Sequence, residues 1–131
     1  MPHVNWLAVL AAAVASSVLG GIWYSALFAK AWQAAAGLSD EQVAGGNRAL
    51  IFGGAFGLAL IASAVFGLFL GPDPAPRLAV GAGFAAGLCW VTASFGINYL
   101  FERKSLKLFA INGGYHTLQF TLIGAILGFW H

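Results

Sequence analysis

Apolar residues form four long, nearly unbroken runs, and the acidic and basic residues all lie outside them. The runs are Val4–Phe28, Ala49–Leu70, Leu78–Phe101 and Leu108–Trp130. A helix needs about 20 mostly apolar residues to cross a bilayer, whereas a membrane β-barrel needs short segments of alternating polarity. The pattern therefore predicts an all-α, polytopic membrane protein, a bundle of four transmembrane helices.

The connections between the runs have different characters. In the long first connection, Gly37 is typical of a helix C-cap, and Ser39–Gln42 match a capping box, so we expect a short interfacial helix there. Gly71–Pro76 predicts a tight, rigid turn because proline fixes φ, and Glu102–Lys107 predicts a short basic turn. We expect a single domain over residues 1–131.

Composition supports a lipid environment and excludes several functional classes. The 131 residues are 60% hydrophobic and 8% charged, against about 25% charged in soluble domains. The net charge is only +2 and no dense basic run occurs, so a nucleic-acid partner is not expected. A single cysteine, Cys89, excludes an intrachain disulfide, a redox pair and a thiolate zinc site.

The start of the chain resembles a signal peptide only superficially. No Lys or Arg precedes the first apolar run, and the run is longer than the 7–15 residues or so of a signal-peptide core. We therefore expect a retained transmembrane helix.

Basic residues are distributed unevenly over the connections. The second connection carries only Arg77, and the first and third carry the other five: Lys30, Arg48, Arg103, Lys104 and Lys107. Loops rich in Lys and Arg stay in the cytoplasm. We expect a multi-pass membrane protein with the first and third connections in the cytoplasm and both termini outside.

Small residues recur at four-residue spacing in the runs, as in Gly53 and Gly57, Gly83 and Gly87, and Gly124 and Gly128. Small residues let membrane helices approach closely, so this spacing predicts a compact bundle with faces left for self-association. Four short helices rarely enclose a pathway alone. We therefore expect a homo-oligomer or a larger membrane complex, with membrane lipids as further partners.

One polar cluster stands out within the apolar runs. His116 is the only Asp, Glu, Lys, Arg or His inside them, and Asn112, His116 and Gln119 share one helix face. At 1.5 Å per residue, His116 lies about 12 Å from the cytoplasmic start of its helix. We predict a pocket in this inner half, lined by Trp23, Tyr24, Ser94, Asn98, Asn112, Tyr115, His116 and Gln119.

Three interpretations of this cluster remain open. Buried Asn, Gln and His side chains commonly hydrogen-bond between helices and hold a bundle in register. They can also handle a ligand or an ion, and histidine titrates near neutral pH. Catalysis is the least supported interpretation, because a lone imidazole provides neither a metal site nor a nucleophile with its base. We expect no enzyme activity, no cofactor and no metal.

Motifs at both ends of the chain resemble those of a known family. The first is Asn5–Leu10, then Gly21-Ile22-Trp23-Tyr24-Ser25 with Phe28, Lys30, Ala31 and Trp32. The second is Asn112-Gly113-Gly114-Tyr115-His116, followed by Gly124–Gly128. The chain resembles, over nearly its whole length, a bacterial membrane family catalogued as domain of unknown function 1761. The resemblance implies a four-helix inner-membrane protein and implies no activity.

Two functional hypotheses follow. The chain is a small carrier or channel component for an ion or small molecule, with its polar pocket around His116. Alternatively, it is an accessory or lipid-binding subunit of a larger membrane complex, as its aromatic and small-residue faces suggest.

Overall fold

The structure, a computed structural model, describes residues 4–131, and its regular elements there are all helical. Residues 1–3 of the expected domain lie outside the described part. The elements are α1 (Trp6–Gly21), η1 (Ile22–Leu27), α2 (Ala29–Ala36), α3 (Asp40–Ala44), α4 (Arg48–Leu70), α5 (Pro76–Ala85), η2 (Ala86–Thr92), α6 (Ala93–Glu102) and α7 (Leu106–Phe129). The segments η1 and η2 are π-helical.

Three of these helical stretches are long and apolar enough to cross a membrane: Trp6–Leu27, Arg48–Leu70 and Pro76–Glu102. They coincide with the first three apolar runs. The fourth run forms α7, which has 24 residues but is not in this set. Its Asn112, His116 and Gln119 make it more polar than the others.

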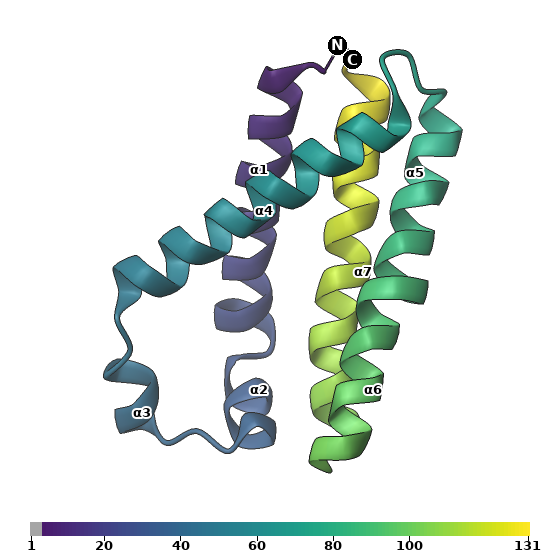
Figure 1. The fold of residues 1–131 in the computed structure, drawn as a ribbon. Coiled ribbons are helices and arrows are strands. Elements are labelled where there is room, and N and C mark those ends of the chain that lie inside the picture. The colour runs from purple at the N-terminus through teal and green to yellow at the C-terminus, as the bar shows by residue number, and fades with distance from the viewer. Residues whose placement is uncertain (1–3) are drawn as a thin grey trace.

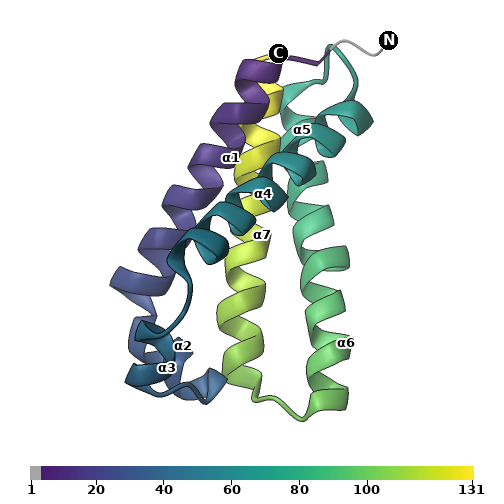
Figure 2. The same cartoon turned by 60° about the vertical axis from the view of Figure 1, so that its left-hand side comes forward.

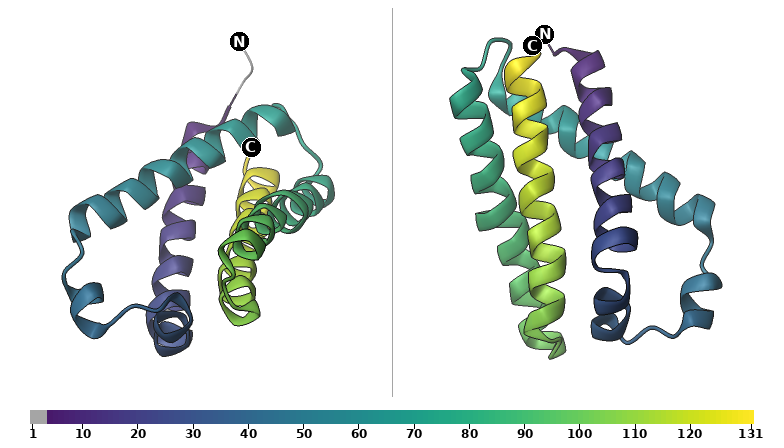
Figure 3. Two further views of the ribbon diagram at one scale, coloured as in Figure 1. Left: turned by 60° about the horizontal axis from the view of Figure 1, so that its bottom comes forward. Right: turned by 180° about the vertical axis from the view of Figure 1, so that it is seen from behind.

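Figure 1 shows α1, α7 and the continuous α5–η2–α6 stretch running side by side, with α4 crossing them diagonally. The turned view in Figure 2 shows the same diagonal crossing. Both ends of the described chain lie at one end of the bundle, which we call the terminal end (Figure 3). The opposite end, with α2, α3 and the α6–α7 turn, is the loop end.

The first connection contains the short, capped helix that its sequence predicts. The Ser39 side chain accepts a hydrogen bond from the backbone N–H of Gln42, and the Gln42 side chain accepts one from the Ser39 N–H. This capping box starts the five-residue α3. Gly37 ends α2 with φ of +73°, a left-handed conformation that glycine adopts without strain.

Glycines bring α7 into backbone contact with α5 and η2. A Cβ atom added to Gly83 or Gly124 would collide with the carbonyl oxygen of Phe120 or Ala79, respectively. At Gly87 it would lie 2.8 Å from the His116 carbonyl oxygen. The predicted close approach is therefore confirmed for the third and fourth spans, and α1, α5 and η2 all pack on α7, whereas α4 packs mainly on α1.

The terminal end is filled by an apolar core. Val4, Ala8, Val9 and Ala12 of the first segment pack with Ile123 and Leu127 of α7, and Phe66 of α4 packs against this group. Ile123 is completely buried. This half of the bundle is therefore dry and closely packed.

The other half of α4 leaves the bundle. Residues 48–55 are all exposed, and no side chain or neighbouring backbone atom lies within 4 Å of a Cβ added to Gly53, Gly54 or Gly57. Only the part of α4 toward Gly67 packs on α1, as Figures 1 and 2 show. The face of α7 toward the loop end is thus left without a helix across it.

The glycine contacts predict a contrast between two substitutions. Gly124→Ala should lower the free energy of unfolding by about 1–3 kcal/mol, because backbone atoms of α5 cannot yield to a methyl group. Gly53→Ala should leave it unchanged or raise it slightly, since alanine favours helix and meets no neighbour. Reversible unfolding in mixed detergent micelles measures both; equal effects would contradict this packing.

Candidate functional site

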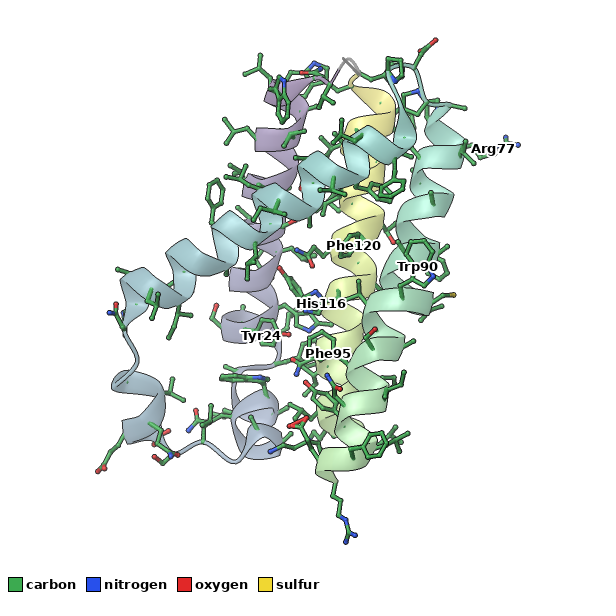
Figure 4. All side chains as sticks on the ribbon, in the orientation of Figure 1. Tyr24, Arg77, Trp90, Phe95, His116 and Phe120 are labelled. Carbon is green, nitrogen blue, oxygen red and sulfur yellow. The ribbon has the colours of Figure 1, made fainter. Side chains whose placement is uncertain are left out.

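The predicted polar face of α7 lies at the loop-end half of the bundle. Asn112, Tyr115, His116 and Gln119 project toward α1, η1 and α6. In Figure 4, His116 lies between Tyr24 of η1 and Phe95 of α6. The structure therefore brings together side chains that are far apart in the sequence, at the level where α4 has left the bundle.

Asn112 joins three helical segments through its side-chain amide. Its Oδ1 accepts a hydrogen bond from the Tyr24 hydroxyl at 2.6 Å, and its Nδ2 donates to the Tyr99 hydroxyl at 2.7 Å. This one amide on α7 therefore holds both η1 and α6 at hydrogen-bonding distance.

Two further aromatic residues fasten the first span to α7. The Trp23 Nε1 donates to the Ile111 carbonyl oxygen at 2.9 Å, and the Tyr115 hydroxyl donates to the Ser16 carbonyl oxygen at 3.0 Å. The Trp23 ring also lies over Gly114, where an added Cβ would come within 3.1 Å of it. Trp23, Tyr24 and Tyr115 thus belong to one connected network, as the sequence suggested.

His116 occupies the centre of the site. Its ring stacks on Phe95, with centroids 5.0 Å apart and planes 16° apart, and meets the Tyr115 ring edge-on at 4.8 Å. Its Nδ1 lies 2.7 Å from Oε1 of the buried Gln119. Because an amide oxygen can only accept, Nδ1 carries the hydrogen.

The other ring nitrogen of His116 is chemically available. Within residues 4–131, Nε2 has no hydrogen-bond partner. In the neutral ring with hydrogen on Nδ1, Nε2 holds a lone pair that can take a proton or accept a hydrogen bond from a ligand. The site therefore offers one titratable acceptor inside an uncharged aromatic and amide shell.

The two remaining predicted residues, Ser94 and Asn98, are not part of this network. Both are exposed, and the Ser94 hydroxyl donates to the carbonyl oxygen of Trp90, itself 74% exposed. Figure 4 places Trp90 away from the group around His116. Phe95 and Tyr99 occupy the positions that these residues were expected to take.

The π-helical segment η2 explains this difference. In a regular α-helix, the residues facing α7 after Gly83 and Gly87 would continue through Ser94 and Asn98. A π-helical turn holds one extra residue, and one residue corresponds to about 100° of rotation. The face beyond η2 is therefore shifted to Thr92, Phe95 and Tyr99, and Thr92 donates to the Gly113 carbonyl oxygen at 2.9 Å.

The π-helical turns also flank the site. η1 carries Trp23 and Tyr24, and η2 carries Thr92. Single π-turns within helices are frequent at functional sites. Sequence reasoning missed Thr92 and Phe95, and the only local signal was the aromatic pair at i and i+4, Phe95 and Tyr99.

The opposite face of α7 carries an apolar groove of about 420 Å³. Gly113 and Gly114 form its floor, and Trp23 and Phe84 stand on its two sides. Among residues 4–131, no three His, Cys, Asp or Glu side chains are grouped so as to hold a metal ion. α7 thus carries the polar network on one side and the apolar groove on the other.

The Asn112 bridge predicts a difference between two asparagines on neighbouring spans. Asn112→Ala removes two interhelical hydrogen bonds and should lower the free energy of unfolding by about 1 kcal/mol, given about 0.6 kcal/mol per bond in membrane proteins. The exposed Asn98 has no such partners, so Asn98→Ala should have almost no effect. Thermal unfolding of both purified variants checks this, and an equal loss in Asn98→Ala would refute the assigned face.

Comparison with known protein families gives one match. The model of a family described as "Protein of unknown function (DUF1761)" matches residues 7–128. No curated protein and no solved structure matches the chain. The match spans all four apolar runs and the whole network around His116, so the chain belongs to the DUF1761 family of proteins of unknown function.

Proposed function

We propose that the chain crosses the membrane four times, with α7 as the fourth span. Its 24 residues reach about 36 Å at 1.5 Å per residue, enough for the hydrocarbon core. α7 is flanked by two spanning stretches, α1–η1 and α5–η2–α6, and its polar side chains are turned toward them. Polar residues are tolerated in a bilayer when they face the bundle interior.

The loop end lies in the cytoplasm, and the terminal end lies outside. This orientation rests on the five Lys and Arg residues of the first and third connections against one in the second. The membrane is then the inner membrane of a bacterium, and α3 lies along its cytoplasmic surface. The His116 site opens toward the cytoplasmic half.

Cysteine labelling tests this topology. In a Cys89→Ala background, an impermeant maleimide added to intact cells should label Asp73→Cys and His131→Cys. It should reach Lys104→Cys only after permeabilisation. Labelling of His131→Cys and Lys104→Cys from the same side would show that α7 does not cross.

The function that the geometry supports best is a carrier or channel component for a small ion, with His116 as its proton-accepting group. The observation that carries this proposal is the unpaired Nε2 of His116 inside an uncharged shell. A titratable group at this depth is costly to maintain. The shell holds the ring in one orientation and leaves a single nitrogen for proton exchange.

The two halves of the bundle support one-sided access to this group. The apolar core around Ile123 lies between His116 and the terminal end. Toward the loop end, α4 has left the bundle, and His116, Tyr24 and Asn112 remain partly exposed. To act as a carrier, the protein would need to move α4 or α1 so that His116 becomes accessible from the outside instead of from the cytoplasm.

Proton flux into liposomes tests the proposal. Purified protein is reconstituted with an internal pH dye, and a potassium gradient with valinomycin sets the driving force. We expect proton uptake whose initial rate falls at least about tenfold in His116→Ala, because no other titratable group of the site can replace the imidazole. The matched control, His131→Ala at the terminal end, should retain the wild-type rate.

The absence of flux in the wild-type protein, or equal flux in His116→Ala, would remove this proposal. A lipid that co-purifies in stoichiometric amount would then favour the second candidate, an accessory or lipid-binding subunit. The observation behind it is the apolar groove over Gly113 and Gly114, whose apolar lining suits an acyl chain. In either function the open surface of α4 around Gly53 and Gly57 is the face available for self-association.

A further inference from the structure

The apolar groove over Gly113 and Gly114 is open along one side of the bundle. In the view from behind, α7 lies uncovered between α1 and the α5–η2–α6 stretch, while α4 crosses on the far side (Figure 3, right). Phe84 and Leu88 of the third span and Leu118 of α7 line the groove, and they are 42–49% exposed. A molecule in the surrounding bilayer can therefore enter this space of about 420 Å³ from the side.

The polar side chains that line the groove are already bonded within the protein. The hydroxyls of Thr92 and Thr117 both donate to the Gly113 carbonyl oxygen, at 2.9 and 2.8 Å. The Trp23 indole N–H donates to the Ile111 carbonyl oxygen at 2.9 Å. The rest of the lining is apolar or glycine. Hydrocarbon can cover this lining without breaking a hydrogen bond, whereas a polar solute would lose its water and find no partner.

The groove has about the length of one lipid leaflet. On α7 its lining extends from Phe109 to Leu118, which is about 14 Å at 1.5 Å per residue. One leaflet contributes about half of a hydrocarbon core that is roughly 30 Å thick. The groove lies toward the loop end, so in the proposed topology an acyl chain in it belongs to a lipid of the cytoplasmic leaflet.

Basic residues lie at the loop-end mouth of this groove. Lys107 is three residues before Ala110 and seven before Gly114, so it shares their side of α7, about one turn beyond the lining. Side chains on a helix lean toward its N-terminus, which directs the Lys107 ammonium toward the membrane surface. Arg103 and Lys104 lie in the turn that leads into α7. None of these three cations forms an ion pair within the described part of the chain.

We propose that the groove binds one anionic phospholipid, with an acyl chain over Gly113 and Gly114 and the phosphate at Lys107 and the adjoining turn. Basic residues at the cytoplasmic end of a membrane helix attract anionic headgroups. A zwitterionic lipid would bring its own cation to this turn and gain less. The site rests on the lipid-binding alternative of the proposed function and specifies its ligand. It does not depend on whether His116 carries protons.

Charge favours a lipid over a second copy of the chain in the groove. The exposed helix that a second copy could insert is the first half of α4, which begins at Arg48. The whole of α4 contains no Asp or Glu. Such a helix offers no negative charge to the basic turn, and juxtaposed like charges oppose association. An anionic lipid supplies the missing charge.

Native mass spectrometry of the delipidated full chain tests the headgroup. In micelles with equal amounts of dioleoyl phosphatidylglycerol and dioleoyl phosphatidylcholine, we expect a one-lipid adduct in which phosphatidylglycerol is preferred at least about tenfold. Lys107→Gln should lower this preference about fivefold, the factor that one Lys or Arg near the membrane surface contributes. The matched control is Arg48→Gln, which removes one positive charge from the first connection and should keep the preference.

A second pair of variants tests the acyl chain. Ala110 and Ala55 are both exposed alanines on membrane-facing helices, but only Ala110 lines the groove. Ala110→Leu should lower the adducts of both lipids at least about threefold, because the chain loses its contacts with the groove wall. Ala55→Leu should leave them unchanged. Glycerophosphoglycerol, which has the headgroup without the chains, should not displace the bound lipid.

Equal binding of the two lipids to the wild type, or a preference that Lys107→Gln leaves intact, would overturn the anionic site while the lipid-binding alternative stands. Adducts that Ala110→Leu leaves intact would overturn the groove as the place of binding. A lipid-free dimer that Ala110→Leu dissociates would identify a second copy as the occupant. If neither lipid binds, the lipid-binding alternative fails as well. The carrier function is decided separately, by proton flux.

Discussion

The backbone contact between α7 and the α5–η2 stretch is the constraint on which the rest of the structure depends. Gly83, Gly87 and Gly124 allow two helices to touch along carbonyl groups, where any side chain would separate them. Lipid offers apolar side chains the same surroundings as a protein core does, so close packing has to replace the hydrophobic effect as the source of association. With one side of α7 committed to this contact, its polar stripe is left to face α1 and η1, and the network around Asn112 and His116 forms there.

The helices can be predicted from the sequence, but the face that the third span turns toward α7 cannot. The capping box at Ser39 and the end of α2 at Gly37 follow from local chemistry, and the structure confirms them. All four apolar runs are helical, and three of them form helices long and apolar enough to cross a membrane. Six of the eight proposed site residues lie in one network because they sit on α7 or on the span directly hydrogen-bonded to it. Ser94 and Asn98 do not, because the extra residue in η2 has no recognisable signature in the apolar sequence Ala86–Thr92. The departure of α4 from the bundle was also unforeseen, since its residues resemble those of any lipid-exposed span.

The bundle combines two unlike halves. At the terminal end, alanine, valine, leucine and isoleucine side chains fill most of the space between α1, α4 and α7. At the loop end, the side chains between the helices are instead three tyrosines, the Asn112 amide and the His116 imidazole. The helix α4 does not cover this half. Membership of the DUF1761 family is consistent with a shared architecture, because the matched region contains both halves. His116, the only histidine or charged residue within the apolar runs, lies in this second half.

The extra residue in η2 has a mechanical consequence. The π-helical turn adds one residue to the helix, so its loss would rotate everything beyond it, from Ala93 to Glu102, by about 100° relative to α7. That rotation would carry Phe95 away from the imidazole and bring Ser94 and Asn98 toward it. The third span can therefore present either of two faces to α7, one aromatic and one hydrogen-bonding, and the two differ by the helical register of a single residue.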